Sequence, residues 1–132
     1  MAAFENDEGS TKLIGFAHSG PGRAIVQKVL TSYMSIIDAV QYSDDGWSAD
    51  VENLLDYGVP IIHQIIVDSP KNDFYYKYHH TAGDSMTIMN PDDMDSNVLG
   101  IAAFLYIIAD LEVSLRNVTN TTNGFEDLES KA

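Results

Sequence analysis

The sequence predicts an α/β fold with a layered architecture, because segments with strand patterns alternate with segments with helix patterns along its 132 residues. About three strands are indicated, which is fewer than the ~5–6 of a typical sheet. One helix is apolar on almost every side, and such a helix is normally covered on more than one side. A small sheet beside this helix indicates that the chain forms part of a larger hydrophobic core.

The first half of the chain contains two expected strands and a helix. We interpret the apolar segment Ala2–Phe4 as a strand that ends in the acidic loop Glu5–Gly9. The apolar segment Leu13–Phe16 follows that loop. Ser19–Arg23 suits a helix start. The apolar pairs that follow form one broad stripe, typical of a helix on a sheet: Ile25/Val26, Val29/Leu30 and Tyr33/Met34. Ala39–Tyr42 has the pattern of a short strand.

The middle of the chain adds a short helix and a further strand. Ser48 is a suitable cap for a helix over Ala49–Tyr57, and Gly58 is a natural stop. Ile61–Val67 is rich in β-branched residues, which favours a strand. The residues that follow, Asp68–Asp73, have turn chemistry.

The last helix has clear start signals. Asn90 is a good cap, Pro91 occupies the first helical position, and two acidic residues then complement the positive end of the helix dipole. One face carries apolar residues at helical spacing: Met94, Val98, Ile101, Leu105, Ile108 and Leu115. From Asn117 the composition turns polar, so we expect one domain over residues 1–116 and a flexible tail over residues 117–132.

Composition excludes several classes of function. The 20 acidic residues outnumber the 7 basic ones and give a formal net charge of -13, so binding to nucleic acid or to an anionic membrane surface is not expected. The longest apolar run, Val98–Ala109, is shorter than the ~20 residues that a membrane span needs. With 0 Cys, a disulfide and a thiolate zinc site are excluded. No signal peptide is visible, so the protein is either cytosolic or its sequence begins partway through a larger one.

Two segments offer side chains that bind metals. Glu5–Gly9 follows a strand, where ligands gather in open α/β sheets, although a solvated acidic turn is the simpler interpretation of this segment alone. His79 and His80 provide imidazoles, and in an extended segment only one of them would face a given site. Asp84 lies just beyond a glycine turn and could orient that imidazole. Packing in an aromatic-rich loop is the alternative role for this histidine pair.

A third segment, Asp44–Asp50, has two interpretations. It could line a cleft with a carboxylate and the indole of Trp47. It could equally be a loop followed by a helix, in which Asp50 complements the helix dipole. His18 and His63 have no partner nearby in the sequence, and we assign them no role.

Taken in order, four segments resemble motifs of the carboxypeptidase Q (plasma glutamate carboxypeptidase) family. Phe4–Gly9 resembles its F-E-S-D-x-G segment, and Gly58–Pro60 resembles the G-V-P before a late strand. Tyr78–Met86 resembles the aromatic-H-H-[ST]-x-x-D-[ST] signature, and Ala109–Glu112 resembles the closing V-x-A-D-M-E run. The resemblance extends over roughly residues 4–116.

The resemblance implies a layered αβα domain of a di-zinc exopeptidase, of which this chain is only the C-terminal portion. It implies that Asp7 and His80 are terminal ligands of two different zinc ions. Asp50 falls where the family has the Asp of a G-T-D loop, near the site but not on a metal, and Asp84 likewise stays beside the metals. The chain departs from the family pattern at positions that are not ligands: Asn6, Ser85 and the Trp47–Ala49 segment.

The family's other ligands have no counterpart in the sequence. They come from an H-x-D segment and an E-E pair whose first Glu is the general base. Two hypotheses follow. The chain is part of a secreted or lysosomal zinc exopeptidase that hydrolyses small peptides, with a homodimer suggested by the family and with glycosylation at the sequons of Asn117 and Asn120. Alternatively, it is a truncated, non-catalytic relative that serves as a binding module. In either case, we expect the chain alone to be inactive.

Overall fold

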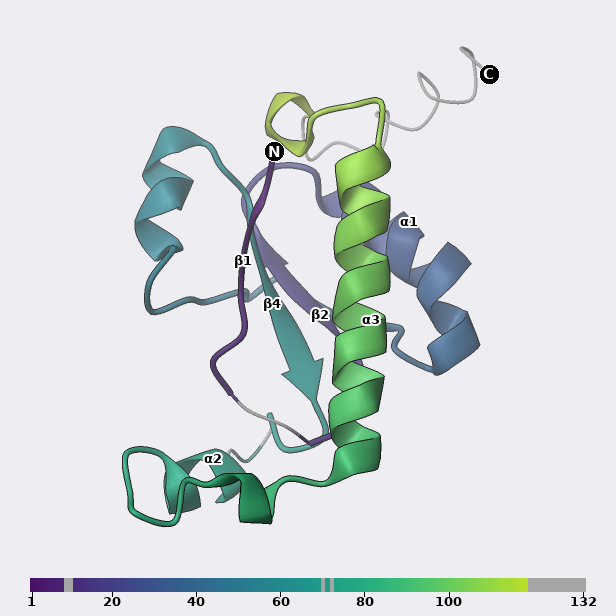
Figure 1. Ribbon diagram of the computed structural model, residues 1–132. Helices are drawn as coiled ribbons and strands as arrows, with labels where there is room; N and C mark the ends of the chain where they lie inside the picture. Colours follow the sequence, from purple (N-terminus) through teal and green to yellow (C-terminus); the bar gives the residue numbers. More distant parts are fainter. Residues whose placement is uncertain (9–10, 70, 72, 119–132) are drawn as a thin grey trace.

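The computed structural model describes residues 1–8, 11–69, 71 and 73–118. In chain order, its strands and α-helices are β1 (Ala3–Glu5), β2 (Leu13–Ser19), α1 (Arg23–Tyr33), β3 (Gln41–Ser43), β4 (Ile61–Ile66), α2 (Asp73–Tyr78) and α3 (Pro91–Asp110) (Figure 1). Short 3-10 helices lie at Met34–Ile37, Glu52–Tyr57, Met86–Ile88 and Leu115–Asn117. The α/β class predicted from the sequence is confirmed.

The strands form one mixed sheet in the order β1-β4-β2-β3. Strand β1 runs parallel to β4, whereas β2 is antiparallel to β4 and parallel to β3. The β-branched strand β4 therefore lies inside the sheet, and β1 lies at one edge. Because β1 and β4 are parallel, their carboxyl ends come together at the same end of the sheet, where α2 also lies (Figure 1).

The strand count predicted from the sequence was too low, because Leu13–Phe16 was not recognised as the start of a strand. This segment begins β2, which pairs with both β4 and β3. Gly15 interrupts its apolar pattern. The glycine is needed because a side chain there would collide with the carbonyl of Gln41 on β3. Gly15 thus weakens the strand pattern in the sequence but allows β3 to approach β2 closely.

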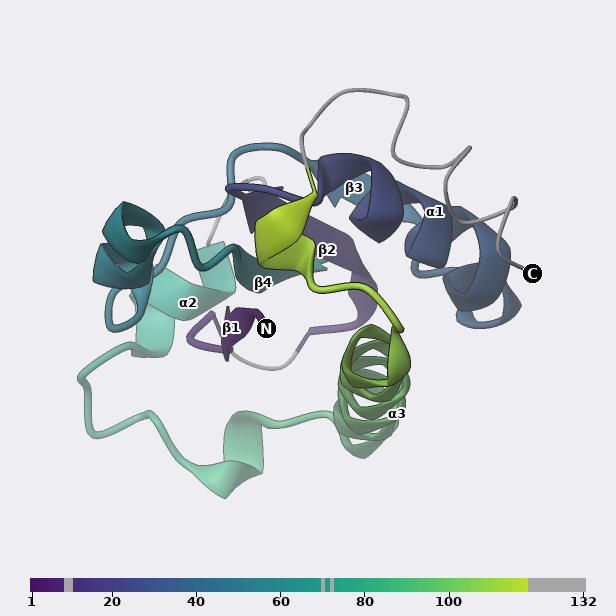
Figure 2. The same cartoon turned by 90° about the horizontal axis from the view of Figure 1, so that it is seen from above.

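Helices α1 and α3 pack on the same face of the sheet (Figure 2). Their apolar side chains form one core with those of the sheet, and Phe16 on β2 stacks on Phe104 on α3 with ring centroids 4.0 Å apart. On the other face, the ring of Trp47 lies 5.5 Å from that of His63. Both long helices of the described chain are on one side, so the three-layer αβα arrangement stays a prediction.

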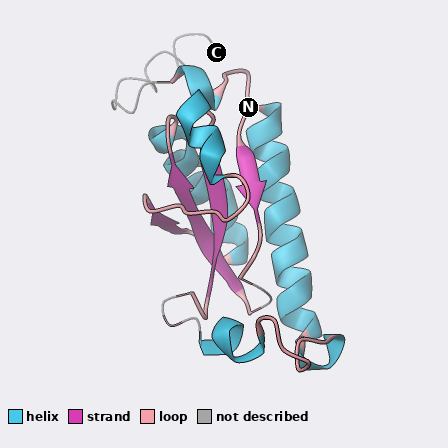
Figure 3. Cartoon of the chain, turned by 90° about the vertical axis from the view of Figure 1, so that its left-hand side faces the viewer, coloured by secondary structure: helices cyan, strands magenta, loops and turns pink. Residues whose placement is uncertain are grey.

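Helix α3 differs from its prediction in two respects. It begins at Pro91, with the side chain of Asn90 accepting hydrogen bonds from the first turn as expected, but it ends at Asp110, before Leu115. Leu115 instead lies in a separate turn and packs against Gly22. The helix runs the length of the sheet (Figure 3), and its outer face is open to solvent within the described chain, because Val98 and Tyr106 are 63% and 71% exposed.

Two shorter elements also differ from expectation. The helix predicted over Ala49–Tyr57 is a 3-10 helix over Glu52–Tyr57, although Gly58 does end it with a positive φ of 69°. The aromatic segment before the histidines, to which the sequence analysis assigned no helix or strand, forms α2. In both cases, contacts with residues outside the element set its local structure.

The predicted tail lies almost wholly outside the described residues, which end at Val118. Asn117 is exposed in the last 3-10 helix, whereas Asn120 falls outside the described part. The domain boundary at residue 116 stays a prediction. Among the described residues, no helix has the length and apolar character required to cross a membrane.

Candidate metal centre

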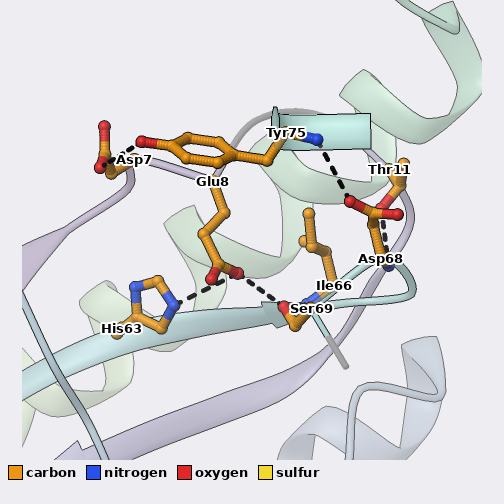
Figure 4. A network of polar contacts seen from close by, with 8 residues as sticks. All are labelled: Asp7, Glu8, Thr11, His63, Ile66, Asp68, Ser69 and Tyr75. Carbon is orange, nitrogen blue, oxygen red and sulfur yellow. Dashed lines mark hydrogen bonds and ion pairs between the residues drawn. The ribbon is translucent and has the colours of Figure 1, made fainter. Parts of the chain in front are cut away.

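The candidate site lies at the carboxyl ends of β1 and β4, where the chain places acidic residues after both strands. Asp7 and Glu8 follow β1, and Asp68 follows β4. The carboxylate of Asp68 accepts a hydrogen bond from the backbone N–H of Phe74 at 2.9 Å. It also accepts one from the backbone N–H of Tyr75 at 3.3 Å (Figure 4). An acidic side chain that accepts from the free N–H groups of a first helical turn stabilises that turn. Asp68 thus attaches α2 to the end of β4.

A cavity of about 250 Å³ lies between the acidic segment and the segment around α2. Three of the side chains that the sequence singled out line it together: Asp7, His80 and Asp84. All three are exposed. The other lining residues are Glu8, Phe74, Tyr75, Tyr78, His79, Ile88 and Met89. The fold therefore brings a carboxylate near the start of the chain to the histidine segment, far away in sequence.

The histidine segment is not extended, so the condition under which only one of the two imidazoles would face a site is not met. His80 has a φ of 55°, in the left-handed region, so the chain reverses there instead of remaining extended. The rings of His79 and His80 consequently stack, with centroids 3.7 Å apart, and both line the cavity. Asp84 lies at the same cavity, but among the described residues its side chain makes no hydrogen bond to either imidazole.

Tyr75 joins the two sides of the cavity and was not singled out from the sequence. Its hydroxyl donates to Oδ2 of Asp7 at 3.2 Å (Figure 4) and lies 3.4 Å from Nε2 of His79. Burial and the nearby charge of Asp7 raise the pKa of this phenol. Its place in the aromatic run before the histidines was the only signal in the sequence.

Glu5 holds the segment that contains Asp50. Its Oε2 accepts hydrogen bonds from the Ser48 hydroxyl and from the backbone N–H groups of Asp50, at 3.0 Å, and of the next residue. The Ser48 hydroxyl, followed by these N–H groups, lowers the pKa of Glu5. Asp50 itself is exposed and does not line the cavity. Earlier in this segment, Asp44 pairs with Arg23 at 2.5 Å, which makes it a surface contact.

A second carboxylate and imidazole meet nearby, away from solvent. Oε2 of Glu8 lies 3.5 Å from Nε2 of His63 and accepts a hydrogen bond from the Ser69 hydroxyl at 2.7 Å (Figure 4). Glu8 and His63 are only 3% and 5% exposed. His18, the other histidine without an assigned role, is also buried, and its Nε2 lies 2.9 Å from the carbonyl of Pro21. Burial is the main cause that lowers the pKa of His18.

The donors at the cavity fit part of a zinc site. Zinc binds carboxylate oxygens and imidazole nitrogens, and Asp7 and His80 provide one of each. A catalytic zinc normally has three protein ligands. Within residues 1–8, 11–69, 71 and 73–118, no three His, Asp or Glu side chains gather in an arrangement that could hold a metal ion. Any complete centre therefore needs donors from beyond this part of the chain.

Known proteins provide an independent comparison. The chain is 31% identical over 113 residues to human carboxypeptidase Q, an alignment that covers 84% of the chain and 23% of the human protein. This chain is a relative of carboxypeptidase Q. Carboxypeptidase Q from Bos taurus is 30% identical, with the same coverage, and that from Rattus norvegicus is 30% identical over 76% of the chain and 20% of the rat protein.

The alignments agree with the resemblance seen in the sequence motifs. The chain spans less than a quarter of the length of these carboxypeptidase Q relatives. No family model and no solved structure matches it. The chain is thus similar in sequence to carboxypeptidase Q, while the roles of individual residues stay predictions.

Proposed function

We propose that this chain is one part of a zinc-dependent exopeptidase or dipeptidase of the carboxypeptidase Q type, which hydrolyses small peptides. Asp7 and His80 each provide a terminal ligand to one of two zinc ions. Asp84 acts beside the metals without coordinating them, whereas the role of Asp50, which does not line the cavity, rests on the resemblance alone. The main support is that Asp7 and His80 line one cavity at the carboxyl ends of two parallel strands, where ligands commonly bind in open α/β sheets.

The chain's own residues have a limited share of the chemistry. When bound, zinc polarises a scissile carbonyl and lowers the pKa of its bound water. Asp7 and His80 hold the metals from one side. The family's remaining ligands and its general base would come from a longer polypeptide. The isolated chain therefore binds zinc weakly and has no peptidase activity of its own.

The wider biology follows from the same family membership. The complete protein acts on small peptides, is secreted or lysosomal, and forms a homodimer. The high negative charge of this chain argues against nucleic acid and anionic membranes as its partners. Asn117, which is exposed, and Asn120 are the expected glycosylation sites in a secretory compartment.

A second function, that of a non-catalytic binding module, is favoured by one observation. The described residues contain no group of three side chains that could hold a metal ion. The size of the native polypeptide separates the two functions. An antibody against this chain should detect a species much larger than 14.5 kDa, with dipeptidase activity that a chelator removes. A native species of about 14.5 kDa without any larger form would instead support the binding module.

The proposed ligands can be tested with the chain itself. Zinc added to the uniformly ¹⁵N-labelled chain should shift the imidazole nitrogens of His80, and Asp7→Asn should weaken the apparent affinity. Chelator-sensitive hydrolysis of a dipeptide by this chain alone would contradict the proposed division of ligands. Absence of any zinc-dependent change at His80 would contradict its role as a ligand.

A further inference from the structure

We infer that Tyr75 is a positioning residue of the proposed zinc site, whose hydroxyl fixes the Asp7 carboxylate and whose ring supports the stacked imidazoles of His79 and His80. This inference rests on the proposed function. It assigns to one side chain the task of holding the two proposed metal-binding segments together, although these segments lie far apart in the sequence.

The first contact concerns the carboxylate. Asp7 is exposed on the segment after β1, and a side chain in such a place has several accessible rotamers. The Tyr75 hydroxyl donates to its Oδ2 at 3.2 Å. Within the described chain, Oδ1 of Asp7 accepts no hydrogen bond, so this oxygen stays accessible to a metal. A hydrogen bond to one oxygen orients the other, as outer groups do around metal ligands.

The second contact concerns the imidazoles. The ring of Tyr75 stacks on His79 with centroids 4.4 Å apart, and His79 stacks on His80 at 3.7 Å. The Tyr75 hydroxyl donates its only proton to Asp7, so its 3.4 Å contact with Nε2 of His79 requires that nitrogen to donate. The contact orients the ring of His79, and the stack transmits that orientation to His80.

The backbone of Tyr75 is held by contacts that do not involve its side chain. Its backbone N–H donates to Asp68 at 3.3 Å, and the N–H of Asp68 donates to the hydroxyl of Thr11 at 3.1 Å (Figure 4). These contacts fix α2 through its backbone and do not involve the Tyr75 hydroxyl. Removing the hydroxyl therefore leaves the helix and the ring stack in place, which makes Tyr75→Phe a test of the hydroxyl alone.

Tyr76 provides a matched control. It is the next residue of α2, its ring meets that of Tyr75 edge-on at 5.3 Å, and it is 72% exposed. It does not line the cavity. Tyr76→Phe therefore makes the same chemical change on the same helix without touching Asp7.

The experiment is a zinc titration of the full chain, followed by the imidazole ¹⁵N resonances of His80. Loss of a group that orients a ligand typically lowers metal affinity by about 10–100-fold. We expect Tyr75→Phe to weaken zinc binding by about tenfold, and Tyr76→Phe to leave it unchanged. Equal affinities for the two variants would overturn the inference.

A metal-free measurement separates this inference from the proposed function. Without zinc, Tyr75→Phe should shift the side-chain carboxyl ¹³C resonance of Asp7 and the ring nitrogens of His79, while Tyr76→Phe should not. Unchanged resonances in Tyr75→Phe would overturn the positioning role, whatever the metal result. If the resonances shift but the wild-type chain shows no response to zinc at His80, the contact is upheld and the ligand assignment in the proposed function fails.

Discussion

Two pairs of a carboxylate and an imidazole lie at the same end of the sheet, and they differ in their access to water. Glu8 and His63 are buried, with a further hydrogen bond from Ser69 to the carboxylate. Asp7 and His80 are exposed at a cavity. Asp7 and Glu8 are neighbours in the sequence, yet their side chains have opposite environments.

The difference separates a structural pair from the proposed ligand pair. A buried carboxylate is tolerated when hydrogen bonds and a basic partner surround it, and those partners leave little room for a metal. An exposed carboxylate with one oxygen held by Tyr75 keeps the other oxygen accessible. Residue type alone therefore does not identify a metal ligand, because both pairs have the same chemistry.

The largest expected effect is on stability. Glu8→Ala removes the partner of a buried histidine and of Ser69, so we expect the free energy of unfolding to fall by about 3 kcal/mol. Asp7→Ala, at an exposed position, should change it by no more than about 0.5 kcal/mol. Urea denaturation followed by circular dichroism measures both. Similar losses for the two variants would remove the distinction between the pairs.

The next effect is on metal affinity, and here we expect substitutions in the exposed pair to have the larger effect. Asp7→Asn and His80→Ala should each weaken zinc binding by about tenfold or more, because each removes a donor. His63→Gln, at the buried pair, should leave zinc affinity unchanged. Isothermal titration calorimetry of the three variants provides the test. If zinc affinity fell only in His63→Gln, the metal would bind at the buried pair of Glu8 and His63, which would contradict the account.

A smaller effect concerns acid stability through Glu5, the third carboxylate of this segment. Its pKa lies below the ordinary 4.5 because the Ser48 hydroxyl and backbone N–H groups favour the charged form. The stability it contributes is therefore fully present above about pH 4.5 and is lost as the pH falls through the lower folded-state pKa. Glu5→Gln should flatten the decline in the urea midpoint between about pH 5 and pH 3. An unaltered decline would mean that the capping contact does not operate in solution.

The smallest expected effect is at Asp50. Its side chain is exposed and does not line the cavity, so Asp50→Asn should change the zinc affinity of the isolated chain less than about twofold. The same calorimetric titration measures this. A tenfold loss would show that Asp50 reaches the metal in solution.

The sequence predicted those parts of the site that depend on local motifs. The histidine segment and the acidic segment after β1 were identified by their resemblance to a family, and Asn90 and Pro91 identified the start of α3 by local capping. The cavity that joins these segments depends on the parallel pairing of β1 and β4, which a single sequence does not reveal.

The features that were missed depend on contacts with residues outside the local segment. Helix α2 is anchored by Asp68, which lies across a turn from it, and the aromatic run alone gave no helical pattern. His63 had no partner nearby in the sequence because its partner, Glu8, is on another strand's loop. The outer face of α3 was expected to be covered, and Val98 is exposed because nothing in the described chain packs on it.

The most direct test of the central claim is a crystal of the chain soaked in zinc and measured at the zinc absorption edge. We predict anomalous density at about 2.0–2.2 Å from a carboxylate oxygen of Asp7 or from an imidazole nitrogen of His80, inside the cavity that they share. Density at Glu8 and His63, or bound zinc that avoids both Asp7 and His80, would contradict the account.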